Sequence, residues 1–207
     1  MTGAVGGIIV FQNMFGENHM TASIKFNPQK LAKLNDPERV AMINPDLIWE
    51  TLQLTTPRVL IDIGAGTGIF ARNFAARMPD GMIYACDSSP VMAAWMQENL
   101  TEENIAALLS AESAVPLENE IADLVYMITV HHELTKPEQL LSEAYRLLKP
   151  GGKAALIDWR KGAVSIGPRD EIRVPEEVVA AQLQQAGFRH VCRYEVLPNH
   201  FLIVGEK

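Results

Sequence analysis

An aspartate and three glycines stand close together in the stretch VLIDIGAGTG. Asp62 follows a run of β-forming residues, and Gly64, Gly66 and Gly68 come after it at alternate positions. Glycines let a chain turn tightly and let a ligand approach the backbone without a Cβ in the way. Ligands of doubly wound α/β proteins bind outside the carboxyl ends of the strands. This turn from strand to helix is therefore the first candidate binding site.

The spacing of the glycines distinguishes between ligands. A dinucleotide-binding loop has the pattern GxGxxG, and its third glycine would fall on Ile69. The pattern present, Asp-x-Gly-x-Gly-x-Gly, resembles motif I of the class I S-adenosylmethionine-dependent methyltransferases. The positive sulfonium and ammonium groups of that cofactor explain the acid, which would repel a pyrophosphate. The resemblance implies that Asp62 and the loop hold the amino-acid end of S-adenosyl-L-methionine, the loop residues being Gly64, Ala65, Gly66 and Gly68.

A second carboxylate, Asp87, ends the next expected strand, 19 residues after Gly68. The resemblance implies that Asp87 accepts hydrogen bonds from both ribose hydroxyls of the cofactor, with Ser88 and Met92 near the adenine. The residues alone leave an alternative, in which Asp87 caps the helix that begins near Pro90.

The residues for the adenine amino group depart from the family pattern. The family often has Gly-Asp-Ala after its third strand, and this chain has Ser110-Ala111-Glu112 in the matching place. Either Glu112 or the backbone near Ala111 is expected to hold the adenine. Ile128, at the end of the fourth expected strand, is also assigned to the cofactor site.

A later stretch strengthens the resemblance. Residues 143–152 read EAYRLLKPGG and resemble the family's E..R.LKPGG segment. That segment is structural, because it ends a helix and turns the chain into the fifth strand. The resemblance covers roughly residues 58–206.

Hydrophobic periodicity predicts alternating strands and helices from residue 58 onward, which indicates a mostly parallel sheet. The short link at 197–199 suits an antiparallel hairpin of the last two strands. The expected fold class is α/β, a doubly wound, Rossmann-like, seven-stranded and mostly parallel sheet with an antiparallel C-terminal strand. The expected strands are 58–63, 82–86, 105–109, 122–129, 153–158, 189–196 and 201–204, and the helices between them 68–78, 90–99, 137–148 and 175–186.

Two short helices are expected before the sheet, because Asp36 and Asn44 each stand before a proline, as N-cap residues often do. Residues 1–26 are expected to be an N-terminal extension of uncertain role. Residues 27–207 are expected to be a class I methyltransferase domain that includes these helices.

Composition excludes several classes of protein. The chain has 207 residues and a net charge of −7, and an acidic protein without a basic cluster is a poor candidate for nucleic-acid binding. No apolar run approaches the ~20 residues that span a bilayer. Cys86 and Cys192 are interpreted as free thiols in a reducing compartment. We therefore expect a cytoplasmic protein with a small-molecule acceptor, no nucleic-acid or membrane partner, and a homodimer as the assembly to test.

Two histidines follow the fourth expected strand and are candidates for chemistry. His132 is the first candidate for a catalytic base and His131 the second. The alternative is that they pack in the loop or bridge to the next helix. The chain has no HExxH pattern and no cysteine partner here, so no metal is expected. Methyl transfer from a sulfonium is a direct displacement, which a dedicated base need not assist.

The loop after the fifth strand is the candidate acceptor site. It has about 15 residues without a clear element, and such loops are often functional. In the family this loop commonly helps to form the acceptor site. Trp159, Arg160 and Arg173 are the expected acceptor residues, with Lys161 and Arg169 as further cations for an anionic acceptor. The alternative is a solvated surface loop.

The leading hypothesis is transfer of a methyl group from S-adenosylmethionine to a small molecule. The sequence resembles small bacterial enzymes of ubiquinone and menaquinone biosynthesis, and it lacks the several cysteines of arsenite methyltransferases. The alternative is a non-catalytic S-adenosylmethionine-binding protein with a regulatory or assembly role. A nicotinamide-dependent oxidoreductase is disfavoured, because the GxGxxG pattern fails.

Overall fold

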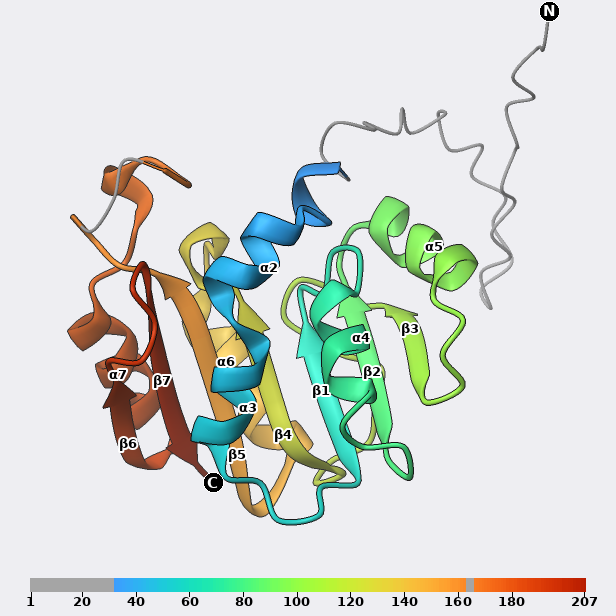
Figure 1. Cartoon of the computed structure of the whole chain (residues 1–207). Coiled ribbons are helices and arrows are strands. Elements are labelled where there is room, and N and C mark those ends of the chain that lie inside the picture. Colours follow the sequence, from blue (N-terminus) through green and yellow to red (C-terminus); the bar gives the residue numbers. More distant parts are fainter. Residues whose placement is uncertain (1–31, 163–165) are drawn as a thin grey trace, which may run out of the picture.

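One sheet of seven strands organises the chain, in the order β3-β2-β1-β4-β5-β7-β6. The structure is a computed structural model that describes residues 32–162 and 166–207. All neighbouring strands are parallel except β7, which runs antiparallel to β5 and β6. The strands, shown in Figure 1, are β1 Val59–Ile63, β2 Met82–Asp87, β3 Ile105–Leu109, β4 Ala122–Ile128, β5 Leu148–Trp159, β6 Arg189–Tyr194 and β7 His200–Glu206.

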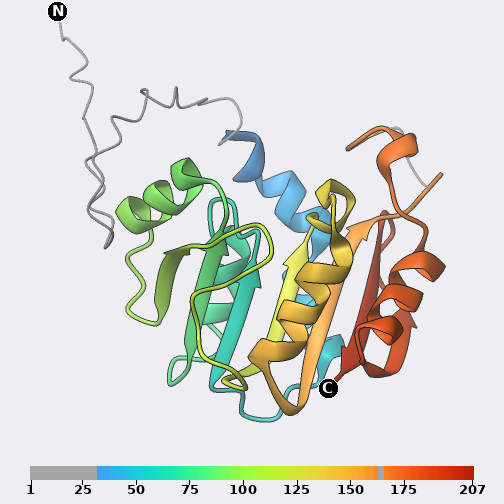
Figure 2. The same ribbon diagram turned by 180° about the vertical axis from the view of Figure 1, so that it is seen from behind.

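Helices cover both faces of this sheet. On the face seen in Figure 1 lie α2 Pro37–Ile43, α3 Pro45–Leu52, α4 Ile69–Ala75 and α5 Pro90–Asn99. Behind it, as Figure 2 shows, lie α6 Pro137–Leu147 and α7 Glu176–Gln185. The predicted fold class is confirmed, including the hairpin of β6 and β7. The two helices expected before the sheet are also present.

These two helices begin where the sequence predicts. The Asp36 side chain accepts a hydrogen bond from the Glu38 N–H at 2.8 Å, and the Asn44 side chain accepts one from the Leu47 N–H at 3.1 Å. Each bond satisfies one N–H group that has no partner within its helix. The start of α2 is thus fixed close to the carboxyl edge of the sheet (Figure 1).

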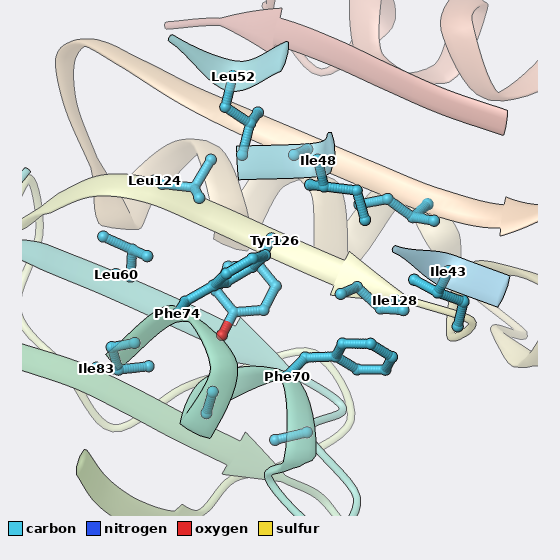
Figure 3. Close-up of a cluster of buried hydrophobic side chains, with 14 of the residues drawn as sticks. Ile43, Ile48, Leu52, Leu60, Phe70, Phe74, Ile83, Leu124, Tyr126 and Ile128 are labelled. Carbon is cyan, nitrogen blue, oxygen red and sulfur yellow. The ribbon is translucent and has the colours of Figure 1, made fainter. Parts of the chain in front are cut away.

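The core is divided by the alternation of side chains along each strand. In β1, Leu60 belongs to the cluster beneath the helices of Figure 1, and Ile61 and Ile63 belong to the cluster on the other face. Asp62 alternates with Ile61 and Ile63 and so shares the face of Leu60. Figure 3 shows the first cluster, in which Tyr126 of β4 also lies.

An aromatic contact joins α4 to β4 in this cluster. The rings of Phe74 and Tyr126 meet edge to face with centroids 5.0 Å apart (Figure 3). The ring of Trp49 of α3 also packs against Phe74, with centroids 5.5 Å apart. Burial of large apolar side chains contributes about 1.5–3 kcal/mol each to folding. These contacts therefore fix α3 and α4 against the strand that ends at the site described below.

The EAYRLLKPGG segment ends α6 at Leu147, as the sequence predicts, but β5 begins already at Leu148 and not at Lys153. Arg146 of α6 donates to the backbone oxygens of Val115 and Leu117 at 3.1 and 2.9 Å, and it pairs with Glu143 at 2.7 Å. Glu143 in turn accepts the Val115 N–H at 2.7 Å. The pair therefore anchors the long crossing from β3 to β4, seen in front of the sheet in Figure 2.

The predicted boundary between residues 26 and 27 lies outside the described residues. Within the described ranges, the structure contains no helix with the length and apolar character needed to cross a membrane.

Candidate active site

A cavity of about 600 Å³ opens at the carboxyl edge of the sheet. The ends of β1, β2 and β4, the loop after β3 and the start of α2 contribute to its wall. Parallel α/β sheets bind ligands at this edge. The cavity is lined by the predicted cofactor residues Asp62, Gly64, Ala65, Gly66, Asp87, Ser88, Met92, Ala111, Glu112 and Ile128.

The glycine loop is held by backbone hydrogen bonds. The N–H groups of Gly64 and Ala65 both donate to the Cys86 carbonyl, at 2.8 and 3.0 Å. Gly64 has φ +74°, and a Cβ on it would lie 2.5 Å from Cγ2 of Val130. Only glycine therefore fits at position 64, where the loop passes beneath the segment that follows β4.

Asp62 lies at the bottom of the cavity and is 2% exposed. Its Oδ2 atom is buried without a hydrogen-bond partner among the described residues. Burial raises the pKa of Asp62 to about 8; the nearby Tyr126 hydroxyl and Arg39 oppose this rise, whereas Asp87 adds to it. A buried carboxylate oxygen without a donor suits a cationic ligand group that can hydrogen-bond. The ammonium group of S-adenosylmethionine has this chemistry.

Asp87 stands at the end of β2 and faces the same cavity. Its Oδ2 accepts the Gly66 N–H at 2.8 Å, and its Oδ1 accepts the Ser89 N–H at 2.8 Å. The residue at the N-cap of α5 is Ser89. The alternative in which Asp87 caps that helix is therefore wrong, and Asp87 instead ties the glycine loop to the end of β2.

The residues expected near the adenine lie on one side of the cavity. Ser110, Ala111 and Glu112 all line it. The Ala111 N–H donates to the Ala114 carbonyl at 2.9 Å. The Glu112 side chain is exposed at the cavity rim. Both alternatives for the adenine contact therefore lie next to the space in question.

Gly68 differs from the other predicted glycines, because it does not line the cavity. It is the N-cap of α4, with φ +72°. A Cβ there would lie 2.7 Å from Cδ1 of Leu100, the residue that follows α5. The third glycine therefore serves the packing of α4 and α5.

Neither candidate histidine is among the residues that line the cavity. The Nδ1 atom of His132 pairs with Asp158 at 2.8 Å, and the His132 N–H donates to the same carboxylate at 3.0 Å. Burial opposes the charged imidazole, but Asp158 outweighs this effect, so the pKa of His132 is raised. His131 is 3% exposed, and burial lowers its pKa. The contacts with Asp158 thus let His132 brace the turn after β4.

The predicted acceptor residues also lie elsewhere than expected. Trp159, Arg160 and Arg173 do not line the cavity. Arg173 is 3% exposed and donates to the carbonyls of Arg160, Ile166 and Pro168 at 2.6–3.0 Å. Its guanidinium lies 5.5 Å from the centre of a Trp159 ring. Arg173 therefore holds the loop after β5 together, and its position does not support the predicted anion site.

The Arg160 side chain is held by contacts with β7 and α7. Its Nε donates to the His200 carbonyl at 2.9 Å, and its Nη1 pairs with Glu176 of α7 at 3.3 Å. Lys161 and Arg169 are exposed. Lys161 donates to the carbonyl of Asp170 at 3.0 Å. The described part of this loop is thus organised by its own contacts.

Among the residues of the cavity wall that sequence reasoning missed are Arg39 of α2 and Thr129 after β4. Arg39 donates from Nη2 to the Thr129 Oγ1 at 3.0 Å. Thr129 has φ +57°, a backbone conformation that is unfavourable for a β-branched residue and recurs at functional sites. No local motif marks either residue, because 90 positions separate them. The sequence predicts the helix that carries Arg39, but it does not place that helix at the site.

Comparison with known proteins identifies the family to which the chain belongs. A family model described as a methyltransferase domain matches residues 61–156. A solved S-adenosylmethionine-dependent methyltransferase from Aquifex aeolicus is 31% identical, with a TM-score of 0.80, and the alignment covers 88% of this chain and 99% of that one. The chain therefore belongs to the S-adenosylmethionine-dependent methyltransferases, whose cofactor is S-adenosyl-L-methionine.

The curated relatives are methyltransferases with different acceptors, and each matches only part of its own length. A malonyl-[acyl-carrier protein] O-methyltransferase of Geobacter sulfurreducens is 31% identical over 65% of this chain and 57% of its own length. A ubiquinone/menaquinone biosynthesis C-methyltransferase of Bordetella avium is 30% identical over 58% of this chain and 50% of its own. The chain thus spans about half the length of the curated relatives it matches.

Proposed function

We propose that this chain transfers the methyl group of S-adenosylmethionine to a small-molecule acceptor. The observation that carries the proposal is the buried Asp62 carboxylate, whose Oδ2 has no hydrogen-bond partner among the described residues, beneath a glycine loop in a cavity of about 600 Å³. That volume suits a small ligand. When bound, S-adenosylmethionine supplies a methyl group on a sulfonium, which is already activated for displacement.

The residues of the chain have the following proposed roles. Asp62 and the loop of Gly64, Ala65 and Gly66 hold the amino-acid end of the cofactor. Asp87 accepts the ribose hydroxyls, which its position on the cavity wall supports. These groups fix the orientation of the cofactor, and orientation is the main contribution that a direct displacement requires.

The adenine is proposed to lie against Ser88, Met92, Ala111 and Glu112, with Glu112 accepting from its amino group. Met92 is 7% exposed and offers an apolar contact, and Glu112 offers a carboxylate at the rim. Ile128 closes the cavity where β4 ends. The acceptor would then approach from the side of Thr129 and Val130, which follow Ile128.

Among the described residues that line the cavity there is no histidine that could act as a base. An acceptor that carries a proton would need a group to receive it. Glu133, the residue after His132, lines the cavity and could do so. We therefore propose that His132 positions the turn through Asp158. The proton, where there is one, leaves to Glu133 or to solvent.

A turnover assay tests the proposal. Purified protein is incubated with S-adenosylmethionine and panels of quinols, phenols, carboxylic acids and amines, and release of S-adenosylhomocysteine is measured. Acceptor-dependent release supports the proposal, and an Asp87→Ala variant should lose it. Binding of S-adenosylhomocysteine with no release across the panels would favour the non-catalytic alternative instead.

A further inference from the structure

Arg39 is a cation in the cavity wall with no part in the proposed chemistry so far. Its Nη1 donates to the Leu34 carbonyl at 3.2 Å and its Nη2 to the Thr129 Oγ1 at 3.0 Å. The guanidinium also lies 5.0 Å from the ring centre of Phe70, another cavity residue. These contacts hold a normally flexible side chain in one place.

The segment that carries Arg39 lies on the glycine loop. A Cβ on Gly66 would be 3.5 Å from Cδ1 of Leu34, so these residues are in contact distance. The Thr67 hydroxyl donates to Asn35 Oδ1 at 2.7 Å. The residues just before α2 are therefore attached to the part of the cavity that is proposed to receive the amino-acid end of the cofactor.

Arg39 and Asp62 influence each other electrostatically. The charge of Asp62 opposes the lowering of the Arg39 pKa by burial, and Arg39 lowers the pKa of Asp62. Asp62 shares the sheet face of Leu60, which is the face covered by α2. The two groups thus form a positive and a negative site on the same side of β1.

The amino-acid end of S-adenosylmethionine carries both an ammonium and a carboxylate. Asp62 complements only the ammonium, and a carboxylate beside Asp62 needs a cation of its own. Among the described residues that line the cavity, the cations are Arg39 and Lys136. Lys136 precedes α6, which covers the opposite face of the sheet (Figure 2). Arg39 is therefore the cation on the side of Asp62.

A guanidinium has five N–H donors in a planar fork that matches a carboxylate. Bonds to Leu34 and Thr129 engage one N–H on each terminal nitrogen among the described residues. The second N–H of each terminal nitrogen remains within the donor capacity of Arg39.

We propose that Arg39 binds the carboxylate of the amino-acid end of S-adenosylmethionine, so that α2 recognises the cofactor together with Asp62. This inference rests on the proposed function. It gives the helix before the sheet a part in selecting the ligand, in addition to covering the sheet.

The test compares two ligands by titration calorimetry. S-adenosylhomocysteine has the carboxylate, and S-adenosyl-3-thiopropylamine keeps the amine but lacks the carboxylate. The wild-type chain should bind the first about tenfold or more tightly than the second, the effect of one charge-assisted hydrogen-bond pair. Arg39→Gln should weaken S-adenosylhomocysteine about tenfold and leave the analogue within about threefold, so that discrimination is lost. Arg39→Lys should retain part of it.

Arg58→Gln is the matched control, because Arg58 is exposed and precedes β1, at the edge of the sheet opposite the cavity. It should keep full discrimination. A purely structural Arg39 would weaken both ligands equally in the Gln variant, and that result would overturn the inference. Equal wild-type affinities would overturn it without any variant. If the wild-type chain bound neither ligand, the proposed function would fail and this inference with it.

Discussion

The backbone N–H of Gly66 donates to Oδ2 of Asp87 at 2.8 Å, which joins the glycine loop to the end of the neighbouring strand. The same carboxylate accepts the Ser89 N–H through Oδ1. One acid therefore sets the loop that is proposed to hold the amino-acid end of the cofactor and is itself proposed to hold the ribose. The two halves of the ligand would be recognised through one connected group.

Replacement of this acid gives the first prediction. Asp87→Ala should weaken S-adenosylhomocysteine binding by about tenfold to a hundredfold, because hydrogen bonds to a charged group are worth about 1.5–3 kcal/mol. Calorimetry measures the loss, and thermal unfolding of the free variant verifies that it folds. Asp80→Ala removes an exposed acid before β2 and should bind as the wild type does. Unchanged affinity in Asp87→Ala would sink the ribose assignment.

Gly64 gives a prediction about stability. Gly64→Ala places a Cβ 2.5 Å from Val130 at φ +74°, whereas Gly162→Ala has a similar φ of +72° with no atom of the described residues within 4 Å. Both variants carry backbone strain of about 1–2 kcal/mol, and only the first adds overlap worth about 1–3 kcal/mol. Denaturant unfolding should therefore show Gly64→Ala as the less stable.

The overlap can be relieved separately. Val130→Ala removes the two Cγ atoms nearest the added Cβ, so the double variant with Gly64→Ala should recover part of the lost free energy of unfolding. A double variant with purely additive losses would contradict the proposed close approach of these two residues.

Asp62 gives a dependence on pH. Burial raises its pKa to about 8, so the folded chain keeps this proton from about pH 4 to pH 8, where the unfolded chain has lost it. The contribution of Asp62 to the free energy of unfolding is therefore largest at low pH and falls as the pH rises through this window. Asp62→Asn should remove this fall, and unfolding of both forms at several pH values measures it.

Binding should show the opposite trend with pH. A ligand ammonium favours ionised Asp62, so S-adenosylhomocysteine should bind the wild type more tightly at about pH 8 than at about pH 6 and should release a proton. Calorimetry in buffers of different ionisation enthalpy counts that proton. Asp62→Asn should bind more weakly and release none. A wild-type affinity that is constant over this range would contradict the role of Asp62.

The pair of His132 and Asp158 is predicted to act on stability. Asp158 raises the pKa of His132 against the effect of burial, so the charge pair stabilises the fold below the unfolded histidine pKa of about 6.5 and loses this contribution as the pH rises through the folded value. Asp158→Asn should therefore lower the thermal midpoint more at about pH 5.5 than at about pH 8.5. An equal loss at both would show that only the backbone contacts of Asp158 matter.

Local sequence was sufficient for the parts of the site that are local in structure. The glycine loop and Asp87 lie at the ends of adjacent strands, and strand ends can be located from hydrophobic runs. Arg39 and Thr129 could not be found in this way, because a helix and a strand end 90 positions apart bring them together.

The loop after β5 shows why charge alone misleads. Trp159, Arg160 and Arg173 are the residue types that an anionic acceptor would need, but Gly167 turns the chain against Trp159, where a Cβ would lie 2.7 Å from the indole. The Arg173 guanidinium donates its hydrogen bonds to backbone carbonyls inside that turn. The sequence could not reveal this fold of the loop on itself, which removes Arg173 from solvent.

Calorimetric titration of the purified chain with S-adenosylhomocysteine is the decisive test of the proposed cofactor site. We expect binding at micromolar concentrations with one ligand per chain, and a lower affinity in Asp87→Ala. No heat of binding, from a protein whose cooperative thermal unfolding shows that it is folded, would leave the fold in place and contradict the proposed methyl transfer.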